Sequence, residues 1–204
     1  MKFIELQNFG WNYLTIIAVM TMLLTVFQAY GISCQSQKIW RTKSGESLSA
    51  TLFFMYCFYF IAFFFYGLSK NSLAMTFNAL LAIPYVPVVV GLIKFKKLTL
   101  AEKISLPLSM AIVPLMIITT EKDALLSVLF IISLGILAMQ PIEMLKTKTR
   151  GAVDIKFIFI FSITSVFWLI YATTIHNPVL TFFNSGALII YALVIYLYYK
   201  PIKK

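Results

Sequence analysis

The sequence predicts an all-α integral membrane protein with seven transmembrane helices, in which two parallel three-helix bundles are joined by a linker helix (3+1+3). Three observations lead to this prediction: the composition, the length of the apolar runs and an internal repeat. Of the 204 residues, 61% are hydrophobic and 12% are charged, whereas an ordinary soluble domain has about 45–50% and about 25%. This composition excludes a soluble globular domain and indicates a chain folded in a bilayer.

Seven apolar runs are long enough to cross the hydrocarbon core, which needs about 20 residues of helix. Each run should be helical, because a backbone group without a hydrogen-bond partner is costly in lipid. Strands of a membrane barrel would alternate polar and apolar residues, and residues 157–175 do not alternate. The predicted spans are Trp11–Ser33, Leu48–Ser69, Leu73–Ile93, Leu100–Thr120, Ala124–Leu145, Phe157–Ile175 and Pro178–Tyr199.

The basic residues are distributed unevenly between the two sides of these spans. The loops after spans 1, 3 and 5 and the C-terminal tail contain fourteen of the 17, and the other side contains Lys2, Lys70 and Lys122. Because positive residues accumulate on the cytoplasmic side, the N-terminus is predicted outside and the C-terminus in the cytoplasm, in a plasma or inner membrane. The fourteen are Lys38, Arg41, Lys43, Lys94, Lys96, Lys97, Lys103, Lys146, Lys148, Arg150, Lys156, Lys200, Lys203 and Lys204.

An internal repeat relates spans 1–3 to spans 5–7. Polar and aromatic residues recur at an offset of 105 up to the loop between spans 2 and 3, and at 106 after it, so a one-residue slip is expected in that loop. The three predicted segments are a first repeat (1–98), a linker helix (99–121) that keeps the repeats parallel, and a second repeat (122–204). The matching positions include Gln35 and Gln140, Lys43 and Lys148, Tyr66 and Tyr171, then Asn71 and Asn177, Asn78 and Asn184, Tyr85 and Tyr191.

A short motif lies at the same place in both repeats. The first copy has Gln35 eight residues before Lys43-Ser44, followed by Leu48-Ser49, and the second has Gln140 eight residues before Lys148. This pattern resembles the PQ-loop motif of the SWEET and PQ-loop transporter superfamily, over residues 28–200. The resemblance implies a seven-helix transporter that works by alternating access.

The motif's proline is replaced in both copies, by Cys34 and by Met139, while Pro141 follows the second glutamine. In the family these prolines act as hinges. The resemblance therefore implies hinge or gating positions at Gln35, Gln140 and Pro141, with the proline missing from span 1.

Trp168 and Asn184 lie sixteen residues apart, on either side of the turn near His176. At 1.5 Å per residue, both should lie about 12 Å from that turn, and Phe63 and Asn78 should lie at a similar depth in the first repeat. Family members have a substrate-contacting Trp and Asn at this spacing, so the resemblance implies substrate binding by Trp168 and Asn184.

The remaining candidates follow from helical periodicity. Tyr59 stands four residues before Phe63, and Thr164 occupies the equivalent position before Trp168. The predicted substrate-binding set is thus Asn78, Asn184, Trp168, Phe63, Tyr59 and Thr164. The alternative is that the aromatic residues pack in the core and that the asparagines bond to each other or to neighbouring helices.

A small neutral solute, with a sugar as the first candidate, suits these side chains. Amides offer donors and acceptors that match hydroxyl groups, aromatic rings cover the apolar face of a sugar, and no charged residue lies in the middle of any span. A uniporter is therefore expected. No metal cluster, phosphate loop or nucleophile motif is present, so we expect no enzyme, cofactor, metal or nucleic-acid partner; the bilayer is the other partner, and homo-oligomer formation stays open.

Two alternative functions remain open. The first is a carrier of an amino acid or vitamin precursor, with proton coupling through Glu143 or Asp154 at the inner ends of spans 5 and 6. The second is a membrane receptor or assembly factor on the same scaffold, because a fold does not determine a function.

Overall fold

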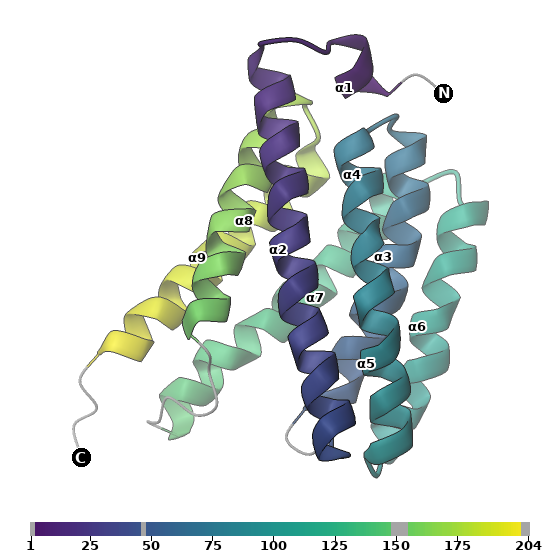
Figure 1. Cartoon of the computed structure of the whole chain (residues 1–204), viewed down its shortest axis with the longest axis vertical. Coiled ribbons are helices and arrows are strands. Elements are labelled where there is room, and N and C mark those ends of the chain that lie inside the picture. Colours follow the sequence, from purple (N-terminus) through teal and green to yellow (C-terminus); the bar gives the residue numbers. More distant parts are fainter. Residues whose placement is uncertain (1–2, 46–47, 148–154, 201–204) are drawn as a thin grey trace. The chain divides into compact units, whose positions relative to one another are not determined.

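The computed structural model describes residues 3–45, 48–147 and 155–200. Most of these residues are helical and none lies in a strand (Figure 1). Five helical segments are long and apolar enough to cross a membrane. The all-α membrane class is therefore confirmed. The elements are α1 (Ile4–Gln7), α2 (Tyr13–Thr42), α3 (Ala50–Ser69), α4 (Leu73–Asn78), the 3-10 turn η1 (Ala79–Leu81), α5 (Ala82–Phe95), α6 (Leu100–Ile118), α7 (Lys122–Thr147), α8 (Ile155–Thr174) and α9 (Pro178–Tyr199).

The chain divides into two compact units, unit 1 (Met1–Lys122) and unit 2 (Asp123–Lys204). In unit 1, α2, α3 and the α4–η1–α5 segment pack together, and α6 packs along α3. In unit 2, α8 packs against α9, and α7 contacts α9 through stacked aromatic rings. The helix predicted as a linker thus lies in the same compact unit as the first three spans.

The first and third predicted spans differ most from the helices of the structure. The first span does not end at Ser33, because α2 continues to Thr42 and ends only where Lys43 adopts a left-handed conformation with φ 50°. Burial of Ser36 and Ile39 along its inner face explains the extension. The third span is not one helix: it is interrupted by η1, and Pro87 lies inside α5.

A hydrophobic core cluster of unit 1 lies at the end of the unit where α2 finishes and α3 begins. Buried side chains from α2, α3, η1 and α5 fill it. Gly91 of α5 makes room for α2, since a Cβ there would lie 2.9 Å from Ile39 Cγ2. The indole N–H of Trp40 donates to the Pro87 carbonyl at 2.8 Å, across the same contact. The core residues are Ile32, Ile39, Ala50, Phe54, Cys57, Leu81, Tyr85, Val88, Val89 and Leu92.

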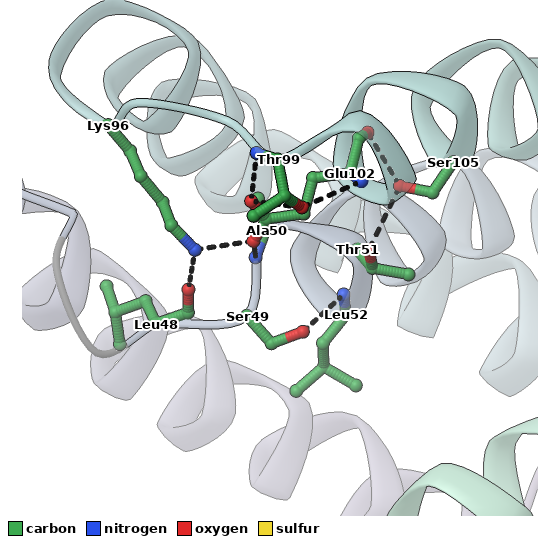
Figure 2. A network of polar contacts seen from close by, with 9 residues as sticks. All are labelled: Leu48, Ser49, Ala50, Thr51, Leu52, Lys96, Thr99, Glu102 and Ser105. Carbon is green, nitrogen blue, oxygen red and sulfur yellow. Dashed lines mark hydrogen bonds and ion pairs between the residues drawn. The ribbon is translucent and has the colours of Figure 1, made fainter.

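A polar clasp joins α3, α5 and α6 at this same end of unit 1 (Figure 2). The Glu102 carboxylate accepts from the backbone N–H groups of Thr99 (3.0 Å) and Ala50 (3.1 Å), so it caps α6 and also the first turn of α3. Lys96 forms an ion pair with Glu102 and donates to the Leu48 carbonyl. The loops after spans 1 and 3, both predicted on the basic side, therefore lie together at one end of unit 1.

The opposite end of unit 1 is closed by the N-terminal helix α1. The buried Glu5 carboxylate accepts from Ser72 Oγ (3.1 Å) and from the backbone N–H groups of Leu73 (2.8 Å) and Ala74 (3.0 Å). These N–H groups have no partner within α4, and a negative charge there interacts favourably with the helix dipole. A charged side chain from a separate helix therefore caps α4.

Replacing Glu5 with alanine should loosen this cap. We expect Glu5→Ala to destabilise the start of α4 by about 1–2 kcal/mol, and to raise hydrogen exchange at the amides of Leu73 and Ala74. Glu5→Gln keeps an acceptor oxygen, so its stability and its exchange rates at these amides should lie between those of Glu5→Ala and the parent. Unchanged exchange in Glu5→Ala, measured by mass spectrometry in detergent, would show that Ser72 alone suffices.

The α3–α4 and α8–α9 turns have the same backbone and capping geometry. Asn71 (φ 50°) and His176 (φ 53°) are left-handed, and the following N–H groups, of Ser72 and Asn177, donate to carbonyls five residues back at 3.0 Å and 2.8 Å. Ser72 and Asn177 then cap α4 and α9 through their side chains. The equivalent residues of the two turns, Asn71 with His176 and Ser72 with Asn177, are 105 positions apart. The predicted change of the repeat offset from 105 to 106 therefore does not occur in this loop.

Candidate functional site

Asn78 is the last residue of α4 and stands directly before the 3-10 turn. The residue is 7% exposed, and its Oδ1 lies 3.0 Å from the hydroxyl of Thr25 on α2. The same hydroxyl lies 2.9 Å from the Thr21 carbonyl. One hydroxyl hydrogen cannot serve both acceptors, so Asn78 has hydrogen-bonding capacity that Thr25 does not use.

The interruption of the third span follows immediately after Asn78. Pro84 and Pro87 have no N–H, so the carbonyls of Leu80 and Ile83 lack their usual helical donors. A 3-10 segment within a span is a common hinge element. We did not predict this break from the sequence, although the Pro84-Tyr-Val-Pro87 pattern within an apolar run could have indicated it.

The aromatic stripe predicted on α3 forms a continuous stack. Ring centroids of Tyr59 and Phe63 are 5.5 Å apart, and those of Phe63 and Tyr66 are 5.8 Å apart, with interplanar angles of 27° and 15°. Phe63 is 1% exposed and Tyr59 is also buried. For Phe63 this environment favours the alternative role of core packing.

In unit 2, the predicted residues are buried in their own helices. Asn184 is 5% exposed and donates through Nδ2 to the Leu180 carbonyl at 2.8 Å. The Thr164 hydroxyl donates to the Ile160 carbonyl at 2.8 Å. Trp168 is 6% exposed and meets Tyr171 edge to face, with centroids 5.5 Å apart. Thr164 therefore has its donor occupied, whereas no group of the described residues donates to the acceptor oxygen of Asn184.

The two asparagines are not equivalent positions when the capping turns are aligned. At the offset of 105 shared by those turns, Thr25 corresponds to Phe130 and Asn78 corresponds to Phe183. These partners also touch: the rings of Phe130 and Phe183 are stacked with centroids 4.1 Å apart. Unit 1 thus has a polar pair where unit 2 has an aromatic pair, and Asn184 lies one residue further along its helix.

The hinge candidates lie within continuous helices. Gln35 is half-buried inside α2, and Pro141 is buried inside α7. The side chains of Gln140 and Glu143, and all of Asp154, lie outside the described residues. Bending at these positions therefore remains a prediction, whereas η1 is a break that the structure contains.

Polar residues on α2 were missed from the sequence. Thr21, Thr25 and Gln28 are buried on one face of a transmembrane helix, and Thr25 contacts Asn78. The three residues are spaced four and three positions apart, which places them on one face of a helix. This spacing is the signal that could have identified them.

The described part of the chain contains no group of three His, Cys, Asp or Glu side chains able to hold a metal ion. Comparison of the whole sequence with models of known protein families and with curated proteins finds no match.

Proposed function

We propose that the protein is a membrane transporter that moves a small neutral solute, with a mono- or disaccharide as the expected cargo, by alternating access and without ion coupling. The observation that carries this proposal is the presence of buried amides with unused hydrogen-bonding capacity in spans that have no charged residue at their middle. Asn78 and Asn184 are the two examples. Buried polar groups are costly in a bilayer, so their retention favours a role in binding.

The side chains proposed to contact the solute divide by chemistry. Asn78 and Asn184 would exchange hydrogen bonds with hydroxyl groups, because an amide can both donate and accept. Trp168 would cover an apolar face of the solute, with Tyr59 as a second aromatic candidate. Phe63 and Thr164 would act by supporting their neighbours, since one is packed in a ring stack and the other is bonded to its own helix.

Alternating access requires parts of the helices to bend. We propose that Gln35, Gln140 and Pro141 permit bending in the first and fifth spans. The break at η1, next to Asn78, supports a further bending point, because the carbonyls freed by two prolines weaken the helix there.

Uptake by the purified protein in liposomes tests this proposal. We expect radiolabelled D-glucose, D-galactose or sucrose to enter faster than into empty liposomes, and Asn184→Ala or Trp168→Ala to lower the initial rate at least about tenfold, as loss of about 1.4 kcal/mol of binding would. Phe182→Ala, an exposed position on α9, is the matched control.

Three results would contradict the assignment. Uptake unchanged by both substitutions would remove Trp168 and Asn184 from the binding set. Binding of a sugar without uptake would favour a membrane receptor. Uptake that requires a pH gradient would favour the proton-coupled carrier instead of a uniporter.

A further inference from the structure

Helix α2 has a buried face that carries polar residues and an exposed face that carries large apolar residues. Thr21, Thr25 and Gln28 are buried, whereas neighbouring large apolar side chains are exposed: Phe27, next to Gln28, is 63% exposed. This exposed apolar face points away from the core of unit 1. Gln28 therefore points into the protein.

The amide of Gln28 differs from the other polar groups of this face. Thr21 and Thr25 donate to carbonyls of their own helix, at 2.8 Å and 2.9 Å. Gln28 is only 8% exposed, yet among the described residues it has no hydrogen-bond partner. Every fully covered side-chain nitrogen or oxygen atom described does have a partner, so the amide atoms of Gln28 are not fully covered and keep some exposed surface.

An amide that is nearly enclosed but still reachable is suited to a bound molecule. Leaving a buried amide unbonded is unfavourable, and a neutral hydroxylated solute could satisfy both its donors and its acceptor. Gln28 lies three residues after Thr25, about 4.5 Å along the helix axis, and Thr25 contacts Asn78 at 3.0 Å. These three side chains thus line one polar strip within unit 1.

We propose that Gln28, Thr25 and Asn78 form a single hydroxyl-recognition site in unit 1, in which Gln28 determines which hydroxyl groups of the solute are accepted. This inference rests on the proposed transport of a neutral hydroxylated solute and names the residue that gives it specificity. Gln28→Leu, of similar size without hydrogen bonds, removes the recognition while leaving the apolar contacts.

The first experiment measures uptake of D-glucose and its 2-, 3-, 4- and 6-deoxy analogues by the full chain in liposomes. In the parent, one of the deoxy analogues should have a KM about tenfold higher than that of D-glucose. In Gln28→Leu, the KM for D-glucose should itself be about tenfold higher than in the parent. The same deoxy analogue should then have the same KM as D-glucose in this variant. Gln37→Leu, the same change at an exposed position of α2, is the control. Equal discrimination in the parent and Gln28→Leu would overturn the proposal.

The second experiment does not depend on transport. In a Cys34→Ser/Cys57→Ala background, Gln28→Cys should react with a water-soluble methanethiosulfonate at least about tenfold faster than Phe27→Cys, because the thiolate forms in contact with water. D-glucose should slow the reaction. If the parent carries no sugar, the proposed function fails, and labelling still decides Gln28: fast labelling supports an accessible polar site, and labelling no faster than at Phe27 overturns it.

Discussion

Gly67→Ala should be among the most destabilising single substitutions in unit 1. Gly67 is buried near the end of α3, and a Cβ there would lie 2.7 Å from Thr76 N, 2.8 Å from Thr76 Oγ1 and 3.0 Å from Met75 C. The first and last of these are backbone atoms of α4, which cannot rotate away as a side chain can. The two helices must separate, and overpacking of this kind costs about 3 kcal/mol.

Glycine is needed at position 67 because α4 approaches α3 closely there, and not because of the turn that joins the two helices. At the equivalent position of the α8–α9 turn, the carbonyl that accepts from Asn177 belongs to Ala172, just as Gly67 accepts from Ser72. That turn has the same left-handed residue and the same hydrogen bonds, and it accommodates a Cβ. The glycine in unit 1 is therefore required by the close contact with Thr76.

The thermal unfolding midpoint in detergent measures this effect. For a chain of this length, about 3 kcal/mol corresponds to a decrease of roughly 6–12 °C. Gly31→Ala is the matched control, because no atom lies within 4 Å of its added Cβ, and alanine in a helix should raise the midpoint slightly. A midpoint for Gly67→Ala within about 2 °C of the parent would show that α3 and α4 are less tightly packed than the structure indicates.

The sequence was sufficient to predict the all-α membrane class and most helix positions. Hydrophobic length determines where a helix can cross a bilayer, so the spans ending at Ser69 and Tyr199 were placed correctly. The first span was ended too early because polar residues after Ser33 resemble a loop, although Ser36 and Ile39 are buried by tertiary packing. Packing of this kind is not visible in hydropathy alone.

The candidate site was less predictable than the fold. The sequence offset of 106 paired Asn78 with Asn184, but the capping turns pair Asn78 with Phe183. Identical residues in the two copies of a repeat do not show where a residue has been inserted, whereas left-handed turn residues and helix caps do. The contact between Thr25 and Asn78 joins residues 53 positions apart, and no local pattern encodes such a distance.

The third span of the first repeat and the last span of the second repeat, which correspond to each other, are also built differently. The segment in unit 1 is interrupted at η1 and contains two prolines, whereas the corresponding helix α9 of unit 2 runs unbroken from Pro178 to Tyr199. Residues 192 and 189, equivalent to Pro87 and Pro84, are alanine and isoleucine. The two copies of a repeat can thus share their turns while only one copy has an interrupted helix. In the proposed function, this interruption is a bending point next to the Thr25–Asn78 pair of unit 1.

Glu102→Ala should have a second large effect, at the opposite end of unit 1. The substitution leaves the N–H groups of Thr99 and Ala50 without an acceptor and leaves Lys96 as a partly buried charge without its partner. The side chains of the ion pair are only 17% and 11% exposed, for Lys96 and Glu102, so solvent compensates little. Loss of one partner of such a pair costs about 3 kcal/mol, with a fall in the unfolding midpoint similar to that of Gly67→Ala.

A double-mutant cycle separates the ion pair from the capping role. Glu102→Gln keeps an acceptor oxygen for the backbone and should cost about 1–2 kcal/mol, and after Lys96→Met the further cost of Glu102→Gln should fall by about 1 kcal/mol. Glu121→Ala, an exposed position after α6, is the control and should change the midpoint little. If Glu102→Ala costs no more than Glu121→Ala, α6 would be held to α3 by apolar packing alone; if it costs more and hydrogen exchange at Ala50 rises with it, a single carboxylate secures the start of both helices.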